Sequence, residues 1–331
     1  MLHSHRLDRL ALVLVTWLIF ATPIPAIAQH IFWSDGLRNQ IWTASFNGAN
    51  PHAIISNLPT SPESIAIDRI ERKVYWTLDG TVNQIRRANL DGTNAETVLD
   101  NGTRPNAIAI DVPGRKMYFG SDESLSIHRA NLDGSSPQLL TTFPGDGVTS
   151  IAVDSAAGQL YWTVENAADL YRSNLDGTNA GLLIDGPSPI ENFGRLESVF
   201  VDPHENRLYL NDEDDSRIFS MPLPEGILTQ FVPEGLMHPR DMTIDVAGRR
   251  LYWTQAGGIF RAQLDGSGAE PVVSGLTDAL GFFPLAIAVI PEPASVLLAL
   301  AGLASCCAFI RTQRTNSIRR RINHKVAACS T

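Results

Sequence analysis

Short apolar segments alternate with polar turns along residues 29–290, and one kind of segment recurs six times. It places an apolar residue before two large, mostly aromatic residues, as in Val74-Tyr75-Trp76-Thr77. The first aromatic position falls at 32, 75, 118, 161, 209 and 252, so the intervals are 43, 43, 43, 48 and 43 residues. A register kept over this distance indicates an internal repeat.

Each repeat carries the signals of four short strands. An apolar segment such as Ile65-Ala66-Ile67-Asp68 precedes the aromatic strand. A third strand ends in an Asp-Gly turn, as at Asp91-Gly92, where Gly accepts the positive φ of a hairpin turn. A fourth apolar segment, such as Glu96–Leu99, follows. Turns at this spacing, without a sustained 3.6-residue period, predict one antiparallel four-stranded sheet per repeat.

One such sheet cannot bury both of its faces, but six sheets stacked around an axis can. The sequence therefore predicts an all-β, six-bladed β-propeller with the apolar first strands innermost. The first copy begins at its second strand, Ile31–Ser34, and its missing inner strand is found at the other end of the body as Leu285–Val289. We expect residues 285–289 to pair with the first blade and close the ring.

The large side chains of the repeated motif are expected to pack between blades, where aromatic pairs add about 0.5–1.5 kcal/mol beyond their buried area. An exposed, ligand-binding role is the alternative for Trp76, Trp162 and Trp253. The motif residues that define the repeat are Trp33, Tyr75, Trp76, Tyr118, Tyr161, Trp162, Tyr209, Tyr252 and Trp253.

Six motifs of the Tyr-Trp-Thr type, with Ala-Ile-Asp before and Asn-Leu-Asp-Gly after, resemble low-density-lipoprotein-receptor class B (YWTD) repeats over residues 29–290. The resemblance implies a propeller that binds protein ligands or neighbouring modules. It also implies structural hydrogen bonds for the aspartate that closes each motif. This aspartate is in place at Asp35 and Asp212, is shifted by one residue at Asp79, Asp122 and Glu165, and is replaced by Gln255.

The N-terminus has the order of a secretory signal. Basic Arg6 and Arg9 precede the apolar run Leu10–Ala21, and Ala26-Ile27-Ala28 provides a small-x-small cleavage site before Gln29. An uncleaved anchor is the alternative, but 12 apolar residues are short for the roughly 30 Å of a bilayer core. We expect residues 1–28 to be a signal peptide.

The C-terminus has a second sorting pattern. Pro291-Glu292-Pro293 is followed by an uncharged run over 294–310 and then by the basic residues Arg311, Arg319, Arg320 and Arg321. The run predicts a transmembrane helix whose arginines stay in the cytoplasm. This order resembles the PEP-CTERM signal of Gram-negative bacteria, which implies recognition by an exosortase-type sorting enzyme. The expected domains are thus a propeller at 29–290, a sorting signal at 291–321 and a basic, polar tail at 322–331; an ordinary stop-transfer anchor is the alternative.

Charge and cysteine content narrow the possible partners. Residues 29–290 contain 18 basic and 33 acidic residues, so the body carries a net charge of −15. Such a surface repels a phosphate backbone and argues against nucleic acid as a partner. The three cysteines, Cys306, Cys307 and Cys329, all lie in the last 26 residues, so the propeller must be stable without disulfides.

Acidic residues follow the aromatic strand in most repeats. The loops after the second strand share one propeller face with the loops that lead into the next blade, so these acids should gather around one mouth of the channel. We expect a ligand site there that attracts a basic peptide, an amine-rich matrix component or Ca²⁺, with Asp212 and Asp214 as candidate calcium ligands. The alternative is that these acids satisfy backbone groups between blades. The candidate residues are Asp35, Asp79, Asp122, Glu165, Asp212, Glu213, Asp214 and Asp215.

The sequence contains weaker signals for catalysis than for ligand binding. The chain has no Gly-x-Ser-x-Gly elbow before a helix, no His-Glu-x-x-His segment and no cysteine-based metal spacing. The inner-strand aspartates, such as Asp68 and Asp111, repeat uniformly, which favours a structural role over channel-metal chemistry. The sequence thus predicts an exported, non-catalytic binding propeller of the cell envelope or extracellular matrix, with no cofactor apart from candidate calcium. A metal-dependent hydrolase of the lactonase type is the alternative.

Overall fold

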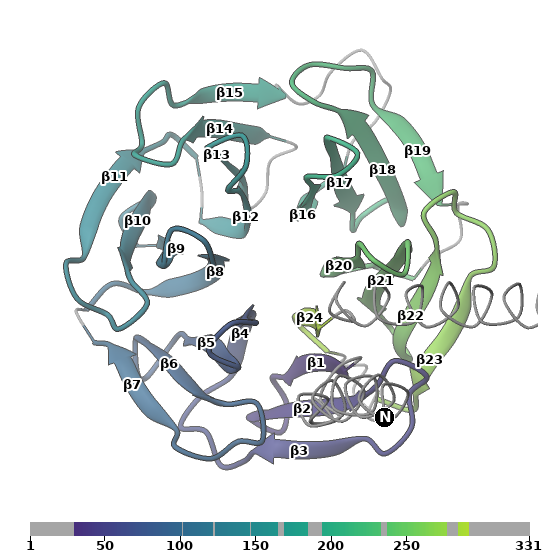
Figure 1. Ribbon diagram of the computed structural model, residues 1–331, viewed down its shortest axis with the longest axis horizontal. Coiled ribbons are helices and arrows are strands. Elements are labelled where there is room, and N and C mark those ends of the chain that lie inside the picture. Colours follow the sequence, from purple (N-terminus) through teal and green to yellow (C-terminus); the bar gives the residue numbers. More distant parts are fainter. Residues whose placement is uncertain are drawn as a thin grey trace, which may run out of the picture. The chain divides into compact units, whose positions relative to one another are not determined.

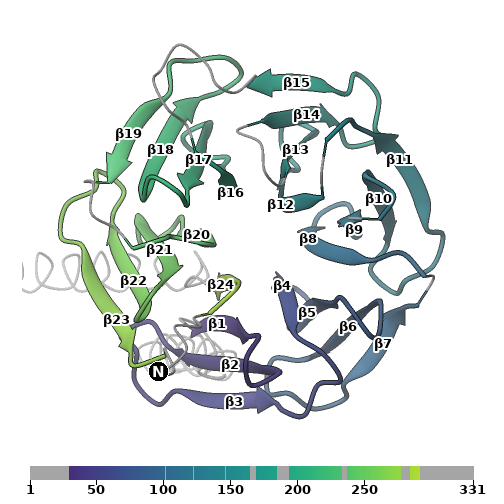
Figure 2. The ribbon, with the colours of Figure 1, turned by 180° about the vertical axis from the view of Figure 1, so that it is seen from behind.

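The described part of the chain forms a closed ring of six sheets (Figures 1 and 2). The computed structural model describes residues 30–290 except 101, 122, 146, 165–168, 185–193, 233–236 and 277–283. Every sheet has four antiparallel strands, and the predicted six-bladed all-β propeller is confirmed. The inner strands β4, β8, β12, β16, β20 and β24 surround the axis in both views.

The strands follow the repeat in chain order, four to a blade. Blade one consists of β24 (Ile287–Ile290), β1 (His30–Asp35), β2 (Gln40–Ser45) and β3 (His52–Ile55). Blade two consists of β4 (Pro62–Asp68), β5 (Lys73–Leu78), β6 (Gln84–Asn89) and β7 (Glu96–Leu99). Blade three consists of β8 (Pro105–Asp111), β9 (Lys116–Ser121), β10 (Ser126–Asn131) and β11 (Gln138–Thr142).

The second half of the ring has the same organisation. Blade four consists of β12 (Val148–Asp154), β13 (Gln159–Val164), β14 (Leu170–Asn174) and β15 (Gly181–Ile184). Blade five consists of β16 (Leu196–Asp202), β17 (Arg207–Asp212), β18 (Arg217–Pro222) and β19 (Thr229–Val232). Blade six consists of β20 (Met242–Asp245), β21 (Arg250–Gln255), β22 (Gly258–Gln263) and β23 (Glu270–Ser274).

The ring closes as the sequence predicts. Strand β24 pairs antiparallel with β1, so that Trp33 lies opposite Ile287 and His30 lies opposite Ile290. The strand begins two residues later than the predicted segment, but Leu285 and Ala286 still exchange backbone hydrogen bonds with Ser34. Closure by a segment from the far end of the body gives blade one the inner strand that the other five blades have, so β1 is paired on both sides.

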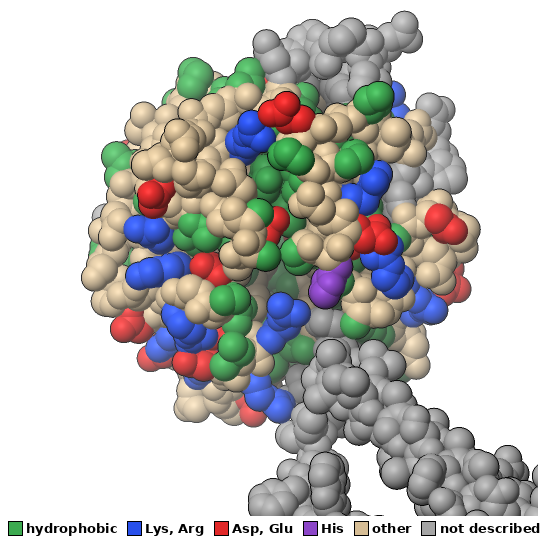
Figure 3. Space-filling view, turned by 45° about the horizontal axis from the view of Figure 1, so that its top comes forward, with side chains coloured by type: hydrophobic (Ala, Val, Ile, Leu, Met, Phe, Trp, Pro, Cys, Tyr) green, Lys and Arg blue, Asp and Glu red, His purple; other side chains and the backbone are tan. Residues whose placement is uncertain are grey.

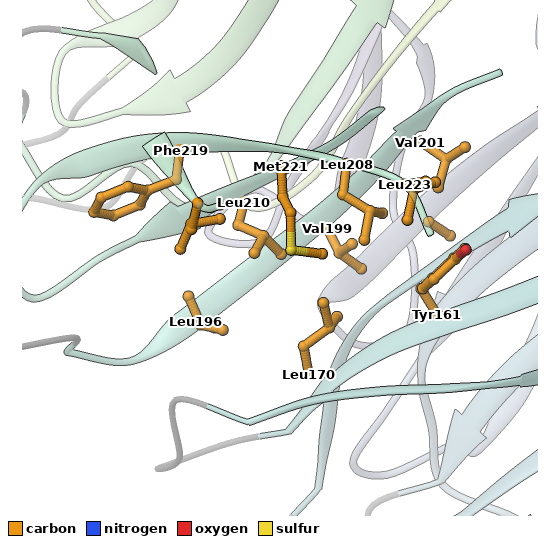
Figure 4. Close-up of a cluster of buried hydrophobic side chains, with 12 residues drawn as sticks. Tyr161, Leu170, Leu196, Val199, Val201, Leu208, Leu210, Phe219, Met221 and Leu223 are labelled. Atoms are coloured by element: carbon orange, nitrogen blue, oxygen red, sulfur yellow. The ribbon is translucent and has the colours of Figure 1, made fainter. Parts of the chain in front are cut away.

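The core lies between the blades. The indoles of Trp33, Trp76, Trp162 and Trp253 are fully buried, so the core interpretation of these residues is confirmed. Figure 4 shows one interface, where residues of blade four such as Tyr161 and Leu170 face side chains of blade five such as Leu196 and Val199. Each blade therefore buries one face against each neighbour, which an isolated sheet could not do.

The fourth position of the aromatic motif connects adjacent blades. In blade two the Thr77 hydroxyl accepts a hydrogen bond from the Ser64 amide at 3.1 Å and donates to the Asn106 carbonyl of blade three at 3.2 Å. In blade five, Asn211 occupies this position; it accepts from the Ser198 amide at 2.6 Å and donates to the Arg240 carbonyl of blade six at 2.8 Å. The motif is therefore a connector as well as a source of core side chains.

The inner-strand aspartates have the structural role that their uniform repetition predicts. Asp68 ends β4 and accepts hydrogen bonds from the Ile70 and Glu71 amides of the next turn. Asp202 does the same for His204 and Glu205 in blade five. An aspartate that bonds the backbone two and three residues ahead fixes a tight turn, and these turns lie on one face of the ring.

Several expectations concern residues outside the described part of the chain. These are the signal peptide at 1–28 and the sorting signal at 291–321 with its transmembrane segment, 294–310. Among the residues that the structure describes, no helix is long and apolar enough to cross a membrane.

Candidate functional site at the channel mouth

One mouth of the channel is lined by the first residues of the inner strands. The same face carries the loops that leave the second strands, as the sequence predicts. A cavity of about 240 Å³ opens there, and all six blades contribute to its wall. Its lining residues are Glu63, Ser64, Asp79, Asn106, Thr149, Ser150, Arg195, Glu197, Arg240, Asp241, Leu285 and Ala286. A second cavity, of about 190 Å³, continues down the channel between mainly apolar inner-strand residues.

Asp241, just before β20, holds three elements together. One carboxylate oxygen accepts hydrogen bonds from the Ser198 hydroxyl and the Met242 amide, both at 2.8 Å. The other accepts from the Ile287 amide at 2.8 Å. Burial raises the pKa of Asp241 to about 6, although these hydrogen bonds act in the opposite direction. A carboxylate in this place is costly to ionise because its donors are neutral.

Asp241 stands where three other blades carry serine and two carry alanine, Ala107 and Ala286. The hydroxyls of Ser64, Ser150 and Ser198 accept hydrogen bonds from inner-strand amides of the next blade, those of Ile108, Val199 and Met242. These distances are 3.2–3.3 Å, against 2.8 Å for the bond from Ile287 to Asp241. The repeat thus provides a blade-to-blade bond at four of its six copies, and one of these four positions has gained a negative charge.

Two arginines form the cationic side of the cavity. Arg195 makes ion pairs with Glu197, at 3.5 Å, and with Glu213. Arg240 pairs with the same Glu213 at 3.4 Å. Glu213, from the loop after β17, is 5% exposed, so it joins both guanidinium groups from behind the cavity wall. This network holds the two arginines in fixed positions.

Two further carboxylates belong to blade two. Asp79 accepts two hydrogen bonds from Arg104, both at 2.9 Å, in a bidentate pair. Glu63 accepts a hydrogen bond from Ser61, and burial raises its pKa above the ordinary value. Figure 3 shows acidic and basic side chains interspersed over the surface that it displays, so the charges on that side are mixed in sign.

The structure separates the acids that the sequence groups together. Asp79 lines the cavity, and Glu213 lies behind it. Asp35 accepts hydrogen bonds from the backbone and the guanidinium group of Arg38. Asp122 and Glu165 lie outside the described residues.

The remaining acids of the loop after β17 serve the backbone and one arginine. Asp212 is fully buried and accepts from the Gly194 and Asp215 amides, each at 3.0 Å, and from Arg217 at 3.1 Å. Asp215 also pairs with Arg217, and Asp214 accepts from the Arg195 amide at 3.0 Å. These acids satisfy backbone groups, as the alternative expects, but the groups belong to blade five itself and do not lie between blades. Among the described residues, no three His, Cys, Asp or Glu side chains are grouped as for a metal ion.

The sequence interpretation missed five charged residues of the cavity, namely Glu63, Arg195, Glu197, Arg240 and Asp241. Aligning the repeats would have revealed most of them. The residue before the serine position is polar in five copies, Glu63, Asn106, Thr149, Glu197 and Arg240, and is Leu285 in the sixth. Polar residues at the start of an apolar inner strand must lie at the mouth.

Comparison of the sequence with known proteins finds partial matches, and no protein-family model matches the chain. A segment is 38% identical over 72 residues to Nidogen-2 of Mus musculus, covering 22% of this chain and 5% of that protein. Another match is Protein cueball of Drosophila erecta, 32% identical over 81 residues, covering 23% of this chain and 12% of that protein. Vitellogenin receptor Yl of Drosophila melanogaster is 34% identical over 71 residues, covering 21% of this chain and 4% of that protein. The chain is homologous to YWTD propeller repeats of this type.

Solved structures agree on the fold. The nidogen/laminin complex contains a chain that superposes with a TM-score of 0.68 at 22% identity, covering 79% of this chain and 98% of that one. A gluconolactonase of Xanthomonas campestris gives a TM-score of 0.52 at 17% identity, covering 70% of this chain and 76% of that one. At these identities the likeness shows the propeller fold alone.

Proposed function

We propose that the protein is an exported, non-catalytic propeller that binds a protein or extracellular-matrix ligand at the channel mouth. The observation that carries the proposal is the cavity itself, where charged side chains such as Glu63, Arg240 and Asp241 meet on the face where loops gather. Two of the similar proteins support a macromolecular ligand, since one is a vitellogenin receptor and one was solved in a nidogen/laminin complex.

The two terminal segments support a location outside the cytoplasm. On this proposal the signal peptide is removed before Gln29, and an exosortase-type enzyme processes the tail after Pro291-Glu292-Pro293. The protein then resides at the cell envelope or in the extracellular matrix; without processing, residues 294–310 anchor it in the membrane. N-terminal sequencing and intact mass of the protein from its producing cell test both cleavages.

Site-specific photo-crosslinking tests the binding face. Leu37, in the loop between β1 and β2, is 44% exposed on the mouth face, whereas Ile70, in the turn between β4 and β5, is 69% exposed on the opposite face. A photoreactive amino acid at each position, in the full chain expressed in its producing cell, provides a matched pair. We expect a defined crosslinked product from position 37 and none from position 70.

Crosslinks from position 70 alone, or equally from both positions, would contradict binding at the mouth. The lactonase alternative is tested on the same preparation with zinc and calcium analysis and a panel of lactones and phosphoesters. Metal-dependent turnover that depends on Asp241 or Glu63 would replace the binding proposal.

A further inference from the structure

The charges that line the mouth cavity do not balance. Its wall holds four carboxylates, those of Glu63, Asp79, Glu197 and Asp241, but only two guanidinium groups, those of Arg195 and Arg240. Arg104 pairs with Asp79 from outside the lining, and Glu213 pairs with both cavity arginines from behind. Including these neighbours, five negative charges meet three positive ones.

The excess negative charge can be assigned to two residues. Asp79 has Arg104, and Glu197 has Arg195. By contrast, Asp241 is bonded only by a hydroxyl and two amides, and Glu63 by a hydroxyl. Within the described residues, neither carboxylate takes part in a salt bridge. Burial raises the pKa of both groups; Arg240 acts in the opposite direction on Glu63, but less strongly than burial.

The cavity also contains an acceptor that lacks a donor. The side-chain oxygen of Asn106 is buried and has no hydrogen-bond partner in the described structure, while its amide nitrogen donates to the Val148 carbonyl. A buried acceptor of this kind costs free energy until a donor reaches it. The cavity therefore needs positive charge and N–H donors, not further acceptors.

We propose that the mouth cavity receives one lysine or arginine side chain of a protein partner, with Glu63 and Asp241 as its counter-charges. The inference rests on the proposed function and specifies its ligand. An ammonium or guanidinium group has donors for two carboxylates and for Asn106, and no acceptor. Arg69 lines the channel below, and its positive charge disfavours a second cation at that depth.

The test uses the full chain in mild detergent and a matched pair of small probes. Nα-acetyl-lysine methylamide carries the cation, and Nα-acetyl-norleucine methylamide has the same shape without it. Ligand-observed NMR titration should show saturable binding of the lysine probe alone. The arginine analogue should compete with it, and millimolar calcium should not.

Variants that each neutralise one carboxylate then show which residues bind the lysine probe. We expect Glu63→Gln and Asp241→Asn each to weaken lysine-probe binding about tenfold, because each removes a desolvated counter-charge. Glu96→Gln, which neutralises an exposed acid of β7 paired with Arg87, is the control and should leave the affinity unchanged. Glu63→Gln changes a side chain with a single hydroxyl partner, so it stays informative if Asp241→Asn folds poorly.

Equal binding of the two probes, or unchanged affinity in both cavity variants, would overturn the inference. Competition by calcium at the same residues would replace the organic cation with a metal ion. Failure of this inference can be distinguished from failure of the proposed function. Crosslinking at position 37 detects a ligand of any charge at the mouth, whereas the probe titration tests only a cationic one.

Discussion

The Asp241 carboxylate accepts a hydrogen bond from the Ile287 amide at 2.8 Å, and this contact joins blade six to the strand that closes the ring. A serine would suffice, since Ser64 and Ser150 make the equivalent contacts between other blades. The aspartate adds a charge that raises the cost of folding near neutral pH and that the proposed ligand would use. Function would then account for a residue that stability alone does not favour.

Replacing Asp241 with serine should stabilise the protein at pH 7.5, by about 1 to 3 kcal/mol, because the amide keeps an acceptor and the desolvated charge is lost. The folded-state pKa of about 6 lies above the ordinary value of 3.8. The folded wild type therefore gains stability by binding a proton as the pH falls through 6, and the advantage of Asp241→Ser should shrink by pH 5. Urea unfolding at both pH values measures this.

Ser150→Ala is the control for the Asp241 experiment. It removes an equivalent blade-to-blade bond, from the Val199 amide, without changing charge. The free energy of unfolding that Ser150→Ala loses should be similar at pH 7.5 and pH 5. An Asp241→Ser variant that is less stable than wild type at pH 7.5, or a difference that does not depend on pH, would show that the charge is not the costly element.

The tyrosine hydroxyls of the motif should contribute unequally to stability. Tyr75 donates to the Leu132 carbonyl of the next blade at 3.1 Å. Tyr161 has no such partner among the described residues, and the corresponding carbonyl, that of Leu223, accepts from Asn206 instead. Tyr75→Phe should cost about 1 kcal/mol, whereas Tyr161→Phe should be nearly neutral. Equal losses in thermal unfolding would contradict the assignment of the Tyr75 bond.

The two faces of the closing strand should differ in sensitivity. Ile287 is 3% exposed and packs in a cluster with Trp33 and Tyr252, whereas Ala288, on the other face, is a small and only partly buried side chain beside the cluster of Phe32. Ile287→Ser should cost about 3 to 5 kcal/mol because it leaves a cavity and buries a hydroxyl. Ala288→Ser should change stability by less than about 1 kcal/mol. Similar melting temperatures for the two variants would mean that the ring does not depend on this closure.

Calcium binding at the loop after β17 should contribute little to the stability of the protein. Both carboxylate oxygens of Asp212 already accept hydrogen bonds, from Asp215 on one side and from Gly194 and Arg217 on the other. Calcium chelation should therefore leave the melting temperature unchanged. Asp212→Ala should cost about 3 kcal/mol, because it breaks a buried ion pair, while Asp214→Ala, at an exposed side chain, should cost less. A rise in melting temperature on adding calcium that is lost in either variant would establish the metal site instead.

The repeat register was sufficient to predict the blades, the inner position of the apolar strands and the closure of the ring. One irregularity of the sequence coincides with a structural one: where Met221-Pro222-Leu223-Pro224 stands in place of the Asp-Gly turn, the tyrosine bond seen at Tyr75 has no counterpart among the described residues. These features follow from local pattern and from repetition.

The partners of the charged groups did not follow from the sequence. Asp79 meets Arg104, 25 residues away, and Asp241 meets Ile287, 46 residues away, only because consecutive blades pack face to face. An acid after the aromatic strand can point to solvent, to a turn or to an arginine of the next blade, and the pattern is the same in each case. The cavity became visible only when six strand ends were placed around one axis.

The closing strand also determines where the two ends of the described chain lie relative to the cavity. Its first residues, Leu285 and Ala286, lie at the cavity, and Val289 lies farther along the channel. Since His30 pairs with Ile290, both ends of the described chain leave from one corner of the ring, remote from the cavity. Residues 30 and 290, where the described chain begins and ends, are thus attachment points on the face opposite the open mouth.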